Sequence, residues 1–135
     1  MTPFALQLRS SRTASGLAQG EFATRVGYRQ SYISAIECGS KLPKDTKLLE
    51  QTISVLKLDL DNAMALREAF QRSQRYDFPP PGTPAFAYDV CAKLSQVVPK
   101  LTQANAKLLD QLVDLIDRDQ GQPTIVNTQR TQRAA

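Results

Sequence analysis

Three glycines divide the first forty residues into short segments, and this spacing limits the fold more than any other feature. They are Gly16, Gly27 and Gly39, and the stretches between them are too short to be stable as isolated helices. Each stretch nevertheless places apolar residues on one side at helical spacing, with a glycine where the helix would end. Such helices must pack against longer neighbours, so the segment predicts a compact helical domain.

The apolar periodicity predicts five helices within residues 1–76. Their expected ranges are 3–14, 18–26, 30–38, 44–56 and 60–75. In each range apolar residues recur three or four positions apart, as the buried face of an amphipathic helix requires. No stretch of residues 1–76 alternates apolar and polar residues as a strand would. We therefore expect an all-α protein with a five-helix domain first.

The composition changes after this domain. Residues 77–84 contain the run Phe-Pro-Pro-Pro-Gly-Thr-Pro, which favours extended polyproline II and is interpreted as a linker, with a rigid loop packed on the domain as the alternative. Residues 85–118 are expected to be helical again. Residues 119–135 are polar and lack periodicity, which indicates a mobile tail.

Leucines that recur every seven residues indicate that residues 85–118 form a helical dimerisation element. The expected contact residues are Leu94, Val98, Leu101, Asn105, Leu108, Leu112 and Leu115. A polar Asn105 at one seam position is interpreted as a possible device that fixes the register. Pro99 must kink or restart the helix, and Leu109 and Ile116 widen the stripe toward that of a helical bundle. In either arrangement the apolar face needs a partner surface.

The residue types argue against an enzyme and against a metal site. The chain has no histidine, and its two cysteines, Cys38 and Cys91, are far apart and belong to no paired motif. No paired carboxylates, Gly-rich phosphate loop or nucleophile elbow is present. We therefore expect no catalytic residue, no cofactor and no metal. With no apolar run near the roughly 20 residues of a membrane span and no secretory signal, we expect a cytoplasmic protein without a membrane partner.

The positive charge is concentrated in the N-terminal part. The first 57 residues carry eight basic and four acidic residues, whereas the remaining 78 carry nine of each. Such placement is typical of a protein that binds a polyanion, although a solvated basic face would have the same composition.

The third predicted helix has an outward face of small or hydrogen-bonding residues. They are Gln30, Ser31, Tyr32, Ser34 and Ala35. Glutamine can pair with both edge atoms of adenine, serine can serve several bases, and alanine can contact a thymine methyl. This face therefore suits the major groove of DNA, while packing beside the core is an equal alternative for Tyr32.

Residues 16–43 resemble the helix-turn-helix of the lambda-repressor-like family, also called the XRE family. The matching residues are Arg12, Gly16-Leu17-Ala18-Gln19, Ala23, Gly27, Ile33-Ser34, Glu37-Cys38-Gly39 and Pro43. The resemblance extends over about residues 4–75 and implies a DNA-binding regulator. It also implies that Gln19 contacts a DNA phosphate and that Gln30 and Ser31 contact base edges. The loop with Ser40, Lys41 and Lys44 would bind the DNA backbone. Arg12 and Glu37 would form an ion pair inside the domain.

Three positions depart from the family pattern. Ala18 replaces the usual Ser or Thr cap of the second helix, which costs about 1 kcal/mol of helix stability. Gly20 lies within that helix and costs roughly 1 kcal/mol more. Arg29 stands where a Ser or Thr is common, and we expect it to contact DNA instead. Gly20 and Thr24 also occupy positions that carry acidic residues in activators of the family, which favours repression.

These observations predict a homodimer, held through residues 85–118, that binds a near-palindromic double-stranded DNA operator. Its half-sites would lie about one helical turn, roughly 34 Å, apart. The expected setting is the bacterial cytoplasm, associated with the nucleoid, for a bacterial, phage or plasmid promoter. One alternative is an antitoxin or adaptor whose C-terminal helices bind a protein partner, with autoregulatory DNA binding. Another is a structural module of a larger phage or plasmid assembly without sequence-specific binding.

Overall fold

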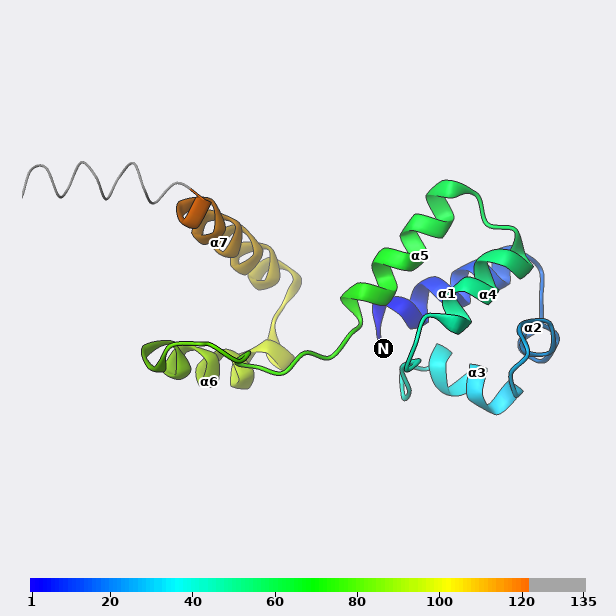
Figure 1. Ribbon diagram of the computed structural model, residues 1–135, viewed down its shortest axis with the longest axis horizontal. Coiled ribbons are helices and arrows are strands. Elements are labelled where there is room, and N and C mark those ends of the chain that lie inside the picture. The colour runs from blue at the N-terminus through cyan, green and yellow to red at the C-terminus, as the bar shows by residue number, and fades with distance from the viewer. Residues whose placement is uncertain (122–135) are drawn as a thin grey trace, which may run out of the picture. The chain divides into compact units, whose positions relative to one another are not determined.

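The computed structural model describes residues 1–121, and every regular element in this range is a helix, which confirms the predicted all-α fold (Figure 1). The chain divides after Tyr76 into two units. The first three residues of the expected tail, 119–121, are instead the end of a helix. Residues 122–135, which hold the rest of that tail, lie outside the described residues.

The N-terminal unit contains five helices, as the periodicity predicted. They are α1 (Pro3–Ala14), α2 (Gln19–Val26), α3 (Gln30–Glu37), α4 (Lys47–Leu56) and α5 (Leu60–Arg72). Among the helix starts the largest difference is that of α4, which begins three residues later than expected. The Oδ1 atom of Asp45 accepts a hydrogen bond from the backbone N–H of Lys47 at 3.0 Å. A short acidic side chain that bonds a nearby amide in this way competes with an earlier helical start.

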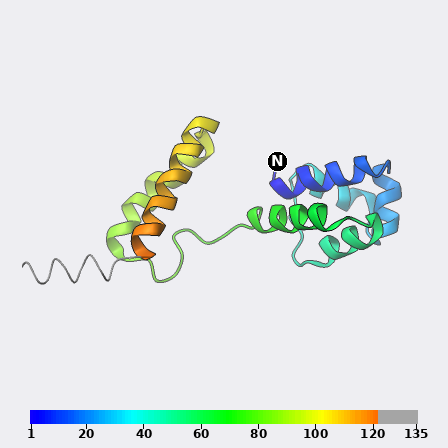
Figure 2. The same ribbon diagram turned by 90° about the horizontal axis from the view of Figure 1, so that it is seen from above.

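The core of this unit lies among all five helices. Its fully buried apolar side chains include Phe4, Leu8, Phe22, Ile33, Ile36, Leu48 and Leu66. Helices α1 and α5 lie side by side, as Figure 2 shows with α1 in blue and α5 in green. The rings of Phe4 and Phe70 join them edge to face, with centroids 5.3 Å apart. Each such buried side chain contributes about 1.5–3 kcal/mol, which lets a domain of this size hold short helices.

Ser73 ends α5 and ties it to the start of α1. Its hydroxyl donates to the carbonyl of Ala69 at 2.7 Å and accepts from the N–H of Phe4 at 2.8 Å. Both bonds are buried, so the hydroxyl satisfies one orphan amide at the start of α1. The helix itself ends at Arg72, three residues before the expected end near residue 75.

A tight turn of three residues joins α2 to α3. Gly27 has φ +84°, a left-handed conformation that a side chain would strain, and the N–H of Tyr28 bonds the carbonyl of Ala23 at 2.9 Å. The chain then re-enters helix at Gln30. In Figure 1 α2 is seen end-on while α3 lies across the view, so the two helices are steeply inclined to each other.

The second unit consists of short helical pieces and one long helix. They are η1 (Ala85–Ala87), α6 (Tyr88–Val97), η2 (Val98–Lys100) and α7 (Gln103–Gly121). The predicted restart at Pro99 is present, because the backbone becomes extended at Leu101, with ψ 133°. The seven-residue spacing therefore runs over separate helices, and the dimer contacts stay a prediction. Of the seven expected contact residues, Leu94 lies on α6, Val98 on η2, Leu101 between helices, and the other four on α7.

Asn105 has a local role that the heptad interpretation missed. Its backbone N–H donates to Oγ1 of Thr102 at 3.1 Å, while its Oδ1 accepts from the N–H of Thr102 at 3.4 Å. This reciprocal pair is a capping box, in which Asn takes the place of the more usual Glu or Gln. The side chain of Asn105 thus stabilises the start of α7, which is a sufficient reason for an asparagine at this position.

The described part of the second unit has no buried side chain. Large apolar side chains at Leu108, Leu112, Leu115 and Ile116 of α7 are all more than half exposed. None of the helices within residues 1–121 has the length and apolar character needed to cross a membrane.

Candidate nucleic-acid interface

Helix α3 has two faces with opposite character. Ile33 and Ile36 are completely buried against the other helices, whereas Gln30, Ser31 and Ser34 are exposed. The inner face is fixed by the core, because losing either isoleucine would leave a cavity. The exposed face consequently presents one carboxamide and two hydroxyls on a rigid scaffold. Ala35, another expected contact on this helix, is half-buried.

Tyr32 lies beside the core rather than on the open face. It is half-buried, and its ring stacks on Tyr28 with centroids 5.1 Å apart and planes 19° apart. Burial raises the pKa of Tyr32, with further contributions from Tyr28 and Asp45. These contacts favour the packing alternative for this residue.

Neither α2 nor α3 has the usual side-chain cap at its start. Ala18 precedes α2 and Arg29 precedes α3, and neither side chain makes a capping hydrogen bond. The first amides of both helices are therefore not satisfied by a cap, and such amides can bind an anion. Arg29 is exposed, so its guanidinium adds positive charge at the start of α3.

The end of α3 is closed by a hydrogen-bonded loop. The backbone N–H groups of Ser40 and Lys41 both donate to the carbonyl of Ala35, at 3.0 and 3.2 Å, and the Ser40 hydroxyl donates to it at 3.1 Å. Together with the bond from Gly39 to Ile36, this is a Schellman motif. Ser40 thus shapes the loop that carries Lys41 and Lys44, both of which are exposed.

Cys38 lies at the same end of α3 and is exposed. Its Sγ lies 3.3 Å from the hydroxyl oxygen of Ser40. Hydrogen bonding from the side chain and then the backbone of Ser40 lowers the pKa of Cys38.

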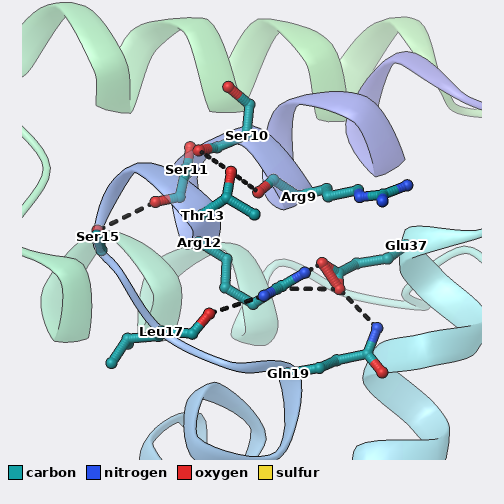
Figure 3. Close-up of polar contacts among 9 residues, drawn as sticks. All are labelled: Arg9, Ser10, Ser11, Arg12, Thr13, Ser15, Leu17, Gln19 and Glu37. Atoms are coloured by element: carbon teal, nitrogen blue, oxygen red, sulfur yellow. Dashed lines mark hydrogen bonds and ion pairs between the residues drawn. The ribbon is translucent and has the colours of Figure 1, made fainter.

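A buried carboxylate joins the first three helices (Figure 3). Glu37 accepts hydrogen bonds from Nε of Arg12 at 2.7 and 3.2 Å, and Nη1 of Arg12 also donates to the carbonyl of Leu17 at 2.7 Å. Only 12% of the Arg12 side chain and 4% of the Glu37 side chain are exposed. The ion pair that the family resemblance implied is therefore present inside the domain.

Gln19 belongs to the same network. Its Nε2 donates to Oε2 of Glu37 at 2.9 Å, and the residue is half-buried as the first residue of α2. A carboxamide nitrogen has two hydrogens, so this bond leaves one for another acceptor. Sequence reasoning expected only the phosphate contact and missed this internal bond.

Arg9 is a further candidate that sequence reasoning missed. A cavity of about 240 Å³ beside the network is lined by Arg9 and Arg12 of α1, Gln19 of α2, Ser34, Glu37 and Cys38 of α3 or its end, and Met1. Figure 3 shows Arg9 and Arg12 on the same side of α1. The spacing of Arg9 and Arg12 could have predicted this, because residues three apart lie on the same face of a helix.

Among residues 1–121, no group of three or more His, Cys, Asp or Glu side chains is arranged to hold a metal ion.

Residues 3–66 match a family model described as a helix-turn-helix domain. No curated protein and no solved structure matches the chain. The matched range begins with α1 and ends inside α5, so it includes the buried carboxylate and the whole of the exposed α3 face. The N-terminal unit is therefore built around a region that matches a helix-turn-helix domain.

Proposed function

We propose that this protein is a sequence-specific transcriptional regulator of the lambda-repressor-like kind, in which α3 reads base edges in the major groove. The observation that carries the proposal is the exposed polar face of α3 opposite its buried isoleucines. Gln30 and Ser31 open the helix and Ser34 follows one turn later. An α-helix fits the major groove, and the N-terminal residues of a recognition helix contact the bases.

Phosphate contacts would surround this face. Arg29 stands at the start of α3, and Lys41 and Lys44 follow its end. Gln19 keeps one amide hydrogen for a phosphate oxygen, and Arg9 lines the cavity beside the same network. Contacts of this kind fix the position of the protein on DNA but carry little sequence information.

The proposal includes a homodimer on a near-palindromic operator. The exposed leucines of α7 supply an apolar surface that one copy leaves uncovered. Two domains would reach half-sites about 34 Å apart. Repression of a bacterial, phage or plasmid promoter, in the compartment that holds the DNA, is favoured because Gly20 and Thr24 offer no carboxylate to a polymerase.

Substitution of Gln30 tests the reading of bases. Gln30→Ala in the full chain should lower affinity for a selected operator by about 1–3 kcal/mol and relax the preference at one base pair. Gln71→Ala is the matched control, since it removes the same group from an exposed position of α5. Unchanged affinity and preference in Gln30→Ala would contradict the proposal.

A second candidate function is that of an antitoxin or adaptor. The same exposed apolar face of α7 suits a protein partner of another sequence, and DNA binding would then be autoregulatory. A different protein that co-purifies in fixed stoichiometry, and is lost from a Leu112→Asp variant, would favour this function over the dimeric repressor.

A further inference from the structure

Gly20, in the first turn of α2, faces the side chain of Gln30 at the start of α3. A Cβ atom placed on Gly20 would lie 3.1 Å from Oε1 of Gln30 and 3.5 Å from its Cδ. No other atom outside its own helix backbone and chain neighbours would come within 4 Å. The Gln30 carboxamide therefore lies over a stretch of α2 that is open only because residue 20 has no side chain.

The first of these distances is shorter than ordinary contact, which begins at about 3.4 Å. An alanine at this position would therefore make the Gln30 carboxamide shift or change rotamer. Because Gln30 is exposed, its carboxamide can move toward solvent without disturbing the core of the domain. The carboxamide is also the group whose position matters most, because bidentate pairing with a base needs both of its polar atoms in place.

We propose that Gly20 is a positioning residue for sequence recognition: the absence of its side chain sets where the Gln30 carboxamide lies above the base pair that it reads. The inference rests on the proposed function of Gln30. It gives a reason for a glycine inside α2, where the residue lowers helix propensity and the helix already lacks a capping side chain. Gly20 thus lowers the stability of α2, but it gives the Gln30 carboxamide a defined position.

The experiment compares four full-length proteins: wild type, Gly20→Ala, Gln30→Ala and the double variant. Each is titrated at one salt concentration against a selected operator and against its single-base-pair variants. Gly20→Ala should melt at or above the wild-type temperature, yet lose preference several-fold at the base pair that Gln30 reads and nowhere else. In the Gln30→Ala background the same substitution should change no base-pair preference. Ser54→Ala, at a neutral and exposed site of α4, is the control.

A second measurement does not depend on DNA. The side-chain amide signals of Gln30, assigned by their loss in Gln30→Ala, should move in the NMR spectrum of free Gly20→Ala and stay in place in Ser54→Ala. Gly20→Ser places a Cβ at the same point and serves if the alanine variant is unstable. Unmoved signals overturn the inference.

The two hypotheses fail in different ways. If Gln30→Ala alters one base-pair preference while Gly20→Ala keeps the wild-type pattern, the positioning role is wrong and the proposed function stands. If Gln30→Ala alters no base-pair preference, the proposed function fails first.

Discussion

The side chain of Gln19 donates a 2.9 Å hydrogen bond to Glu37, so the first residue of α2 is bonded directly to the last residue of α3. The same carboxylate accepts from Arg12 of α1. Three helices therefore meet at one buried charged group, which fixes how α2 and α3 are inclined. The geometry of the exposed α3 face depends on this contact as well as on the apolar core.

Removal of that carboxylate should strongly destabilise the domain. Glu37→Ala leaves the guanidinium of Arg12 buried without its partner, and we expect a loss of about 3–5 kcal/mol in the free energy of unfolding, measured with urea. Glu50→Ala is the control, because Glu50 pairs with Arg67 on the surface and about half of each side chain is exposed. It should cost no more than about 1 kcal/mol. Similar losses in both variants would contradict a structural role for the buried pair.

The uncapped starts of α2 and α3 allow a matched pair of substitutions. Ala18→Ser and Arg29→Ser each introduce a side chain that can cap the following helix, and each should stabilise it by about 1 kcal/mol. Only Arg29→Ser should also weaken DNA binding and reduce the slope of log affinity against log salt by about 1, since it removes one phosphate contact. Thermal melting and binding at several salt concentrations check both effects. Equal salt slopes in the two variants would exclude a phosphate contact by Arg29.

Lys57 ends α4 in a conformation that suits glycine. Its φ is +50°, which is left-handed, and a residue with a Cβ pays about 1–2 kcal/mol there. Lys57→Gly should therefore stabilise the protein by about 0.5–1 kcal/mol in urea denaturation. Ser54→Gly, inside the same helix, should do the opposite by a similar amount. A loss of stability in Lys57→Gly would mean that the lysine side chain contributes contacts larger than the backbone cost.

The pKa of Cys38 gives a prediction about pH. Because hydrogen bonding with Ser40 lowers the pKa of Cys38, its thiolate is populated at lower pH than that of an ordinary thiol. Ser40→Ala removes the largest of these contributions, so the midpoint of the alkylation rate should move to higher pH and the rate at neutral pH should fall. Iodoacetamide kinetics in a Cys91→Ser background follow this thiol alone. An unchanged midpoint would show that the Ser40 hydroxyl does not stabilise the thiolate.

The role of α7 in self-association can be tested with neighbouring residues. Leu112→Asp places a charge on the apolar face and should shift the full chain toward monomer in sedimentation velocity. Gln111→Asp adds the same charge one position away, at a polar and exposed site, and should leave the distribution unchanged. A monomeric wild type at micromolar concentration, or equal behaviour of the two variants, would contradict dimerisation through this face.

Local patterns predicted the N-terminal helices well, because their periodicity and glycine stops act within a few residues. The range of α1 was predicted to the residue, whereas the start of α4 was missed because one side chain, Asp45, captures an amide there. In the second unit a seven-residue spacing continued across Pro99 although the helix did not. A spacing in sequence carries no information about the extended backbone at Leu101.

The candidate site was predicted in part. The outward residues of α3 follow from its periodicity, and the ion pair between Arg12 and Glu37 from the family resemblance. The bond from Gln19 to Glu37 and the approach of Gln30 to Gly20 join residues ten or more positions apart. They depend on how two helices are inclined across a glycine turn, which sequence spacing does not specify.

The length of α3 limits how much sequence one copy of the protein can distinguish. Its eight residues form a helix about 12 Å long, which lies along only three or four base pairs of a groove. A word of four base pairs recurs by chance about once in every few hundred base pairs, so a single copy would find thousands of matches in a bacterial chromosome. Two such four-base-pair sequences at a fixed spacing occur by chance a few hundred times less often than one. Because this helix is short, one domain reads too few base pairs to specify a unique site in a genome. Two domains at a fixed spacing read nearly enough.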